Sequence, residues 1–268
     1  MKYAEYAKEL RRDIETVLYR ARGSFSGGSL SVADVMTVLF RGGYLRLNPE
    51  DPWKPDRDML ILSKGHCSSA LYCSLARAGM FPKEELLTYG MDGSDMVIHP
   101  KIHSYPGVES SSGSLGHGLA LGTGSALAAR IKGYDSRVFV ILGDGECNEG
   151  SVWENAAFAA RQKLNNLIVI VDRNKLQGCG RDSEVLNYGD MAEKWRAFGF
   201  HVFDIDGHDY EMIDQTMKQA VYGDNVQPAA IIAQTTKGKG VSFMEDRLEW
   251  HYKSLNDEQY AQAMKELR

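Results

Sequence analysis

An aspartate between two glycines stands where a metal ion and a phosphate group could bind. Gly143-Asp144-Gly145 follows an apolar run, residues 138–142, that predicts a buried parallel strand. A second apolar run, residues 167–172, delivers Asn174 at the end of a neighbouring strand. Their two side-chain oxygens and a backbone carbonyl, for which Leu176 is the candidate, would form half of an octahedral shell that Mg²⁺ completes with phosphate and water. The spacing therefore predicts a magnesium-phosphate site at the carboxyl edge of a parallel sheet.

The residues around this aspartate resemble the thiamine diphosphate motif in the form found in the transketolase family. Residues 143–154 read Gly-Asp-Gly-Glu-Cys-Asn-Glu-Gly-Ser-Val-Trp-Glu. A bare Asp-Gly pair is common in surface turns, but here a strand precedes it, a helix-compatible run follows at 151–164, and Asn174 ends a second strand. The resemblance implies thiamine diphosphate and Mg²⁺ as cofactors. It makes Asp144, Asn174 and Leu176 the metal ligands, and it places Gly143, Asp144, Gly145, Glu146 and Asn174 at the cofactor.

Three histidines lie in motifs similar to those of transketolases. Ser63-Lys64-Gly65-His66 leaves a short strand into a helix, whose N-terminus suits a diphosphate. Without the family, a histidine before a helix is more often a cap or a surface residue. His99-Pro100 resembles the family's Gly-His-Pro with Ile98 in place of glycine, and Trp250-His251-Tyr252-Lys253 resembles Trp-His-Gly-Lys. The resemblance implies catalytic roles for His66, His99 and His251, and contact of His66 and His251 with the cofactor.

Further positions also match the family. Gly113-Ser114-Leu115 resembles the turn that packs under the cofactor rings. Glu149 and Glu154 match acids that share protons at the subunit boundary, with Glu149 the catalytic candidate; the alternative is a pair of acids that stabilises a helix N-terminus. The resemblance also leaves open a phosphate contact by Lys237.

Two departures from the family concern the substrate. Phe25 stands where transketolases carry a histidine in the substrate channel, and Tyr252 replaces a glycine. A phenyl ring cannot hydrogen-bond a sugar hydroxyl as an imidazole does. Simple packing and a change of substrate explain Phe25 equally well, and the two departures together permit a modified donor such as a branched or sulfonated ketose.

Composition and length indicate the number of domains, the cellular location and the kinds of partner. The chain has 268 residues, enough for one large α/β domain, and we expect a single diphosphate-binding domain over residues 1–268. It lacks an apolar run of membrane-spanning length and an apolar leader after Met1-Lys2, so we expect a cytoplasmic protein that contacts no membrane. The net charge of −5 comes with no basic stripe, which gives no sign of nucleic-acid binding. Four cysteines without Cys-x-x-Cys spacing fit reduced thiols that bind no metal.

Strands and helices alternate along the chain. The alternation predicts an α/β fold, a parallel twisted sheet with helices on both faces. We expect strands at 59–62, 138–142, 167–172, from 201 onward and at 228–235, and helices at 3–21, 32–40, 68–78, 119–131, 151–164, 190–198 and 210–222. The glycine-rich residues 23–30 are expected to form a loop, Ser31 to cap the helix after it, and residues 177–180 to form a turn.

The resemblance covers nearly the whole chain but only the first two fifths of a full-length transketolase. In that family the second domain supplies the glutamate that contacts the aminopyrimidine and the residues that hold a substrate phosphate. The resemblance therefore implies the N-terminal subunit of a split transketolase, which moves a two-carbon ketol unit from a ketose to an aldose. Its partner would be a separate C-terminal subunit with the pyrimidine-binding and C-terminal domains, in an α2β2 heterotetramer.

Two alternatives stay open on the sequence. One is the α-subunit of a thiamine-dependent oxo-acid decarboxylase or dehydrogenase, which would lack the Ser-x-Gly-His and Trp-His motifs present here. The other is an inactive regulatory chain that binds the cofactor.

Overall fold

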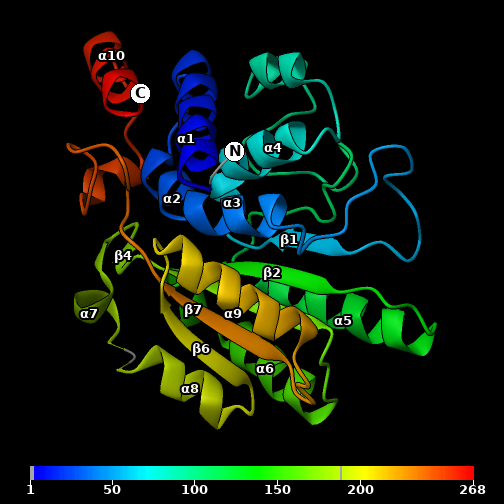
Figure 1. Cartoon of the computed structure of the whole chain (residues 1–268). Coiled ribbons are helices and arrows are strands. Elements are labelled where there is room, and N and C mark those ends of the chain that lie inside the picture. Colours follow the sequence, from blue (N-terminus) through cyan, green and yellow to red (C-terminus); the bar gives the residue numbers. More distant parts are fainter. Residues whose placement is uncertain (1–2, 188) are drawn as a thin grey trace.

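A parallel sheet of five strands runs through the centre of the molecule (Figure 1). The computed structural model describes residues 3–187 and 189–268. The strands lie in the order β1 (Met59–Leu62), β2 (Val138–Gly143), β3 (Leu167–Arg173), β7 (Ala229–Gln234) and β6 (His201–Asp206). Every neighbouring pair is parallel. The carboxyl ends of the strands therefore meet at one edge of the sheet, as the predicted α/β fold requires.

Helices cover both faces of this sheet (Figure 1). One face carries α1 (Tyr3–Arg20), α2 (Ser26–Ser31), α3 (Ala33–Arg41), α4 (Ser68–Arg77) and α9 (Tyr210–Tyr222). The other face carries α5 (His117–Ile131), α6 (Gly150–Arg161) and α8 (Met191–Ala197). Along β2, Phe139 and Ile141 point to the first layer, while Val138 and Val140 point to the second. Both faces of the central strands are thus buried, which explains why their sequences are continuous apolar runs.

Short elements complete the described chain. They are the 3-10 helices η1 (Gly65–Cys67), η2 (Lys83–Thr88), η3 (Gly145–Asn148) and η4 (Leu248–His251), the hairpin of β4 (Leu176–Gln177) and β5 (Gly180–Arg181), α7 (Asp182–Val185) and α10 (Asp257–Glu266). The hairpin contains the turn predicted at 177–180. None of the helices described is long and apolar enough to cross a lipid bilayer.

The glycine-rich segment at 23–30 is not the loop that its composition predicts. Most of it is the buried helix α2. A Cβ atom at Gly27 would lie 2.9 Å from Lys237 Cγ, and one at Gly28 would lie 2.8 Å from Cys67 Sγ. The glycines therefore allow the helix backbone to approach its neighbours closely.

Ser31 does not cap the following helix as expected. Val32 occupies the N-cap of α3 and makes no side-chain cap hydrogen bond. Ser31 ends α2, and its hydroxyl contacts Gly28 O at 3.0 Å and Asp172 Oδ2 at 2.5 Å. The prediction was wrong because the Ser31 hydroxyl donates its hydrogen bond to the buried Asp172 on β3.

Candidate active site

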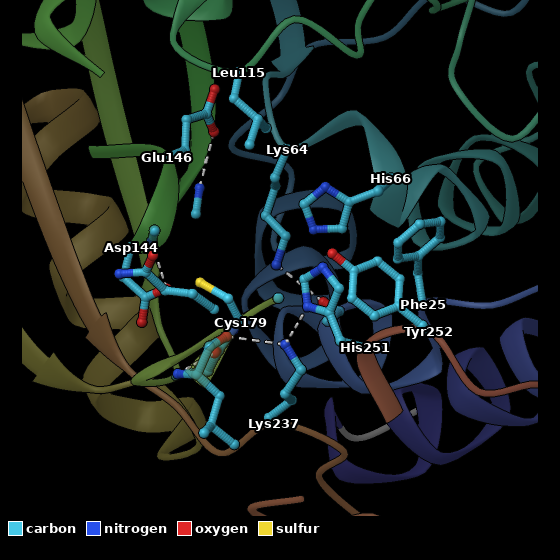
Figure 2. Close-up of a pocket in the computed structure, with 17 residues that line it drawn as sticks. Phe25, Lys64, His66, Leu115, Asp144, Glu146, Cys179, Lys237, His251 and Tyr252 are labelled. Carbon is cyan, nitrogen blue, oxygen red and sulfur yellow. Dashed lines mark hydrogen bonds between the residues drawn. The ribbon is translucent and has the colours of Figure 1, made fainter. Parts of the chain in front are cut away.

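A cavity of about 350 Å³ opens at the carboxyl edge of the sheet (Figure 2). It lies where β1, β2 and β3 end and where the β4–β5 hairpin and η4 approach them. Many predicted site residues line it together: His66, Leu115, Gly143, Asp144, Gly145, Glu146, Asn174, Leu176 and His251. The other lining residues are Phe25, Gly28, Lys64, Gln177, Gly178, Cys179, Lys237 and Tyr252.

The expected metal ligands lie on one side of this cavity. The carboxylate of Asp144 is buried and accepts the backbone N–H groups of Gly145 at 2.7 Å and Lys175 at 2.5 Å. Burial raises the pKa of Asp144, the charge of Asp172 adds to this, and the two N–H groups oppose it. Asn174 Oδ1 accepts the N–H of Leu176 at 3.1 Å. The described residues hold no group of three or more His, Cys, Asp and Glu side chains that could bind a metal. This oxygen set, with its single carboxylate, therefore fits a hard cation whose remaining ligands are phosphate oxygens and water.

Two buried lysines reach the cavity. Lys64 pairs with Asp172 and donates to Gly28 O at 3.0 Å. Lys237 is 2% exposed and donates to Leu176 O at 3.0 Å and to His251 Nδ1 at 2.9 Å. Within the described residues, no carboxylate lies at ion-pair distance from Lys237. Burial and the charge of Lys64 lower the pKa of Lys237 to about 8. A diphosphate would supply the negative charge that this ammonium lacks, so the donor set fits the cofactor's anionic end.

Neutral imidazoles stand beside the lysines. The rings of His66 and His251 have centroids 5.3 Å apart. Burial first, and then the charges of Lys64 and Lys237, lower the pKa of each to about 3. Because the Lys237 ammonium can only donate, His251 Nδ1 accepts and the ring proton sits on Nε2. His99 lies outside the cavity lining and is exposed at its rim. Partial burial of its ring lowers its pKa, and electrostatic repulsion from His66 adds to this.

Phe25 packs close to all three histidines and lies beside His66, His251 and Tyr252 at one side of the cavity (Figure 2). Its ring centroid is 5.2 Å from that of His66, 5.6 Å from that of His251 and 6.2 Å from that of His99. Its φ of 74° is left-handed, which is unusual for a bulky residue. Tyr252 packs 6.0 Å from Phe25 and covers Gly178, where a Cβ atom would lie 2.3 Å from the tyrosine oxygen. Phe25 and Tyr252 thus form an aromatic wall on the side of the cavity opposite Asp144 (Figure 2).

Comparison with known proteins assigns the chain to a family. Residues 4–268 match the family described as transketolase, thiamine diphosphate binding domain. The chain belongs to the transketolase family.

Named relatives in this family include separate subunits. An apulose-4-phosphate transketolase subunit from Phocaeicola vulgatus is 40% identical over 257 residues, which cover 96% of this chain and 90% of that protein. A 6-deoxy-6-sulfo-D-fructose transketolase subunit from a Clostridium species is 39% identical, with 90% of this chain and 87% of that protein covered. The crystal structure of transketolase from Campylobacter jejuni superposes with a TM-score of 0.91 at 30% identity, and it covers 100% of this chain. The chain spans 43% of that transketolase, but most of the length of the named subunits.

The acids of the transketolase motif differ in their surroundings. Glu146 lines the cavity, but its carboxylate accepts from Ser63 Oγ, from Gly116 N at 2.8 Å and from Gly143 N at 3.0 Å. It therefore ties together the segments that follow β1 and β2. Glu149 and Glu154 are both exposed at the start of α6, where Glu149 is the N-cap residue without a side-chain cap bond.

The glycine-serine turn of the transketolase motif lies next to the cavity. Gly113 and Ser114 are exposed, and Leu115 alone of the three lines the cavity. A Cβ atom at Gly113 would lie 3.4 Å from His99 Cδ2, so the turn packs beside the rim histidine.

Several lining residues were not predicted. Lys64 occupies the variable position of Ser-x-Gly-His, and its partner Asp172 lies 108 residues away in the sequence. Gln177, Gly178 and Cys179 follow the predicted Leu176 directly. The sequence could have indicated these three residues, because a hairpin that places Leu176 at the cavity also places its own turn there.

Proposed function

We propose that this chain is the N-terminal subunit of a split transketolase, active in the cytoplasm, which transfers a two-carbon ketol unit from a ketose to an aldose. The observation that carries the proposal is one cavity. It joins the hard-oxygen set of Asp144, Asn174 and Leu176 to two neutral imidazoles and to the buried Lys237, which forms no ion pair among the residues that the structure describes. Residues 1–268 would form a single diphosphate-binding domain, in line with the family match over residues 4–268.

The cavity residues would hold thiamine diphosphate and Mg²⁺. Asp144 Oδ, Asn174 Oδ1 and the Leu176 carbonyl would bind the cation, while Lys237, His66 and His251 would donate to the diphosphate. Gly143 and Gly145 leave room for it to approach the strand ends, with Gly113, Ser114 and Leu115 beneath its rings and Glu146 bracing the loops. When bound, thiamine diphosphate supplies the electron sink for breaking a carbon–carbon bond next to a ketone.

The histidines would handle protons at the sugar. His66 and His251 are neutral near pH 7, so His66 offers one N–H donor and one nitrogen acceptor, while His251, whose Nδ1 accepts from Lys237, offers the N–H at Nε2. His99 stands at the rim, where an incoming ketose would pass. These groups can orient the ketose hydroxyls and exchange a proton with them. Glu149 would act at the boundary with a neighbouring subunit, sharing a proton with another acid.

A separate chain would complete the site. The partner would be a C-terminal transketolase subunit with the pyrimidine-binding and C-terminal domains, assembled as an α2β2 heterotetramer. Relatives that are named as separate transketolase subunits support a divided enzyme. Three apolar side chains are exposed: Leu115 at the cavity, Leu121 on α5 and Phe158 on the adjoining helix α6. They support an interface with a partner protein on this side.

The donor would be a modified ketose, branched or sulfonated, in place of an ordinary sugar phosphate. Relatives are named for apulose 4-phosphate and for 6-deoxy-6-sulfo-D-fructose. Phe25 supports the same conclusion, because its ring offers no hydrogen bond to a sugar hydroxyl at the position where transketolases carry a histidine.

Calorimetric titration of thiamine diphosphate with Mg²⁺ tests this proposal. The titration uses the chain alone, the chain with its partner subunit, and the same complex carrying Asp144→Ala. We expect binding only with the partner, and loss of binding in the variant, because the cation then loses its only carboxylate ligand. We also expect the mixed subunits that bind the cofactor to catalyse ketol transfer. Binding without ketol transfer to any aldose would support the inactive regulatory alternative, and no binding in either mixture would refute the cofactor site.

A further inference from the structure

Asp172 is the most connected buried carboxylate near the cavity. It lies on β3, two residues before Asn174, and is 1% exposed. It accepts hydrogen bonds from Ser31 Oγ at 2.5 Å, from Asn174 Nδ2 at 3.0 Å, from Thr235 Oγ1 at 2.5 Å and from the ammonium of Lys64. These donors come from α2, from the ends of β3 and β7, and from the segment after β1. One side chain therefore joins the segments that build the floor of the cavity.

The contact with Asn174 decides which way its amide points. A carboxylate paired with an ammonium is ionised and can only accept hydrogen bonds. The Asn174 amide must then turn its NH₂ group toward Asp172, where Nδ2 also contacts Ser31 Oγ at 3.4 Å. Its oxygen is left on the opposite side, next to the N–H of Leu176. A cation can bind only that oxygen.

The ion pair with Asp172 fixes the position of the Lys64 ammonium. The Lys64 ammonium reaches the cavity, yet Asp172 neutralises it and the carbonyl of Gly28 holds it. Without the carboxylate, the same ammonium would remain in the cavity as a free anion partner. Loss of Asp172 should therefore weaken binding of the metal without weakening binding of the diphosphate.

We infer that Asp172 is a positioning residue, which orients the Asn174 amide for the cation and restrains Lys64 at the diphosphate. The inference rests on the proposed function, because it assumes that Asn174 Oδ1 is a metal ligand. It assigns no contact between Asp172 and cofactor or substrate.

Asp172→Asn in the two-subunit complex tests the inference by calorimetry. In the variant, residue 172 can donate as well as accept, so the Asn174 amide is no longer held in one orientation. We expect the dissociation constant for Mg²⁺, measured at saturating thiamine diphosphate, to rise about 10- to 100-fold, as for other residues that orient metal ligands. Binding of thiamine diphosphate in EDTA should stay unchanged or become tighter. Parallel loss of both affinities, or no change in either, would overturn the inference.

Two further variants separate positioning from general damage. Asp58→Asn removes another buried carboxylate, 1% exposed, which pairs with Arg46 and Arg137 at the start of β1, away from the cavity. It should lower stability and leave both affinities unchanged. In an Asn174→Ala background, Asp172→Asn should cost no further Mg²⁺ affinity, because its action runs through that amide. Additive losses in the double variant would contradict the inference.

Milder changes serve if Asp172→Asn does not fold. Ser31→Ala and Thr235→Val each remove one donor to the carboxylate and keep its charge. Each should weaken Mg²⁺ binding several-fold with metal-free binding unchanged, and equal loss of both would refute the positioning role. Failure of the unchanged complex to bind thiamine diphosphate or Mg²⁺ would refute the proposed function, and this inference with it.

Discussion

Removal of the Lys237 charge should stabilise the protein while weakening its cofactor site. Lys237 is buried, and its pKa of about 8 lies well below the ordinary 10.5. Because a tenfold change in proton affinity is worth about 1.4 kcal/mol, the protonated lysine costs the folded chain about 3 kcal/mol. Lys237→Met removes that cost, which compares the charged with the neutral lysine, and forfeits the two hydrogen bonds that a neutral amine would make to Leu176 O and His251, worth about 0.5 kcal/mol each. The expected gain in the free energy of unfolding is about 2 kcal/mol at pH 7.

The gain should depend on pH with a definite sign. Below pH 8 both folded and unfolded chains carry the proton on Lys237, so the cost is constant. Between pH 8 and 10.5 the unfolded chain binds a proton that the folded chain has released, and the stability of the unchanged protein rises with pH. By pH 9.5 the cost has fallen by about 2 kcal/mol, and the advantage of Lys237→Met should have vanished.

Urea denaturation of the cofactor-free chain measures the stability gain of Lys237→Met at pH 7 and at pH 9.5. Lys239→Met is the matched control, since Lys239 lies in the same loop but is 38% exposed and 3.6 Å from Glu245. It should give no gain at either pH. Calorimetry of the complex should show diphosphate binding about 10- to 100-fold weaker with Lys237→Met, because a hydrogen bond to a charged group is lost. No gain at pH 7, or the same gain at both pH values, would refute the description of Lys237 as a buried cation without a counter-charge.

Two more predictions concern Phe25 and Glu15. Phe25→His should shift kcat/KM about 3- to 10-fold toward an ordinary ketose phosphate relative to a branched or sulfonated one, because one neutral hydrogen bond is worth about 0.5–1.5 kcal/mol. Ketol-transfer assays with both donors measure the ratio, with Phe25→Leu as control; an unchanged ratio would show that Phe25 only packs. Glu15 is fully buried on α1, contacts Ser26 Oγ at 3.3 Å, and burial raises its pKa to about 8. The folded chain keeps this proton between pH 4.5 and 8 while the unfolded chain loses it, so stability falls as pH rises through that window. Glu15→Gln stays neutral and should be more stable than the unchanged protein by up to about 3 kcal/mol at pH 7, but by less than about 1 kcal/mol at pH 5; equal differences at the two pH values in urea denaturation would contradict this.

Local patterns predicted the sheet well. The runs at 138–142 and 167–172 each form a strand that extends one residue further, because strands buried on both faces need continuous apolar sequence. Helix α2 was not predictable in the same way. Its glycines and serines have weak helix propensity, and the helix exists because Lys237 and Cys67, from distant segments, pack against its backbone.

The residues of the candidate site also fall into those that a local pattern predicts and those that meet only in the folded chain. Residues within motifs, such as Asp144, Asn174, His66 and His251, could be named because their spacing along the chain carries the signal. The pair of Lys64 and Asp172 could not, because the two side chains meet only when β1 and β3 end at one edge of the sheet. The contacts of Glu146 with Ser63 and Gly116 were hidden for the same reason, since these partners lie 83 and 30 residues away in the sequence.

With thiamine diphosphate bound as proposed, the buried Lys237 ammonium would link the lifetime of this chain to the supply of the cofactor. A ligand that binds only the folded state adds about 2.7 kcal/mol at a hundredfold excess over its dissociation constant. Thiamine diphosphate that neutralises Lys237 would thus raise the free energy of unfolding and offset the cost of this buried charge. In a thiamine-starved cell the chain would unfold more often and meet proteases sooner, so the abundance of this protein would follow the nutrient without any dedicated regulator.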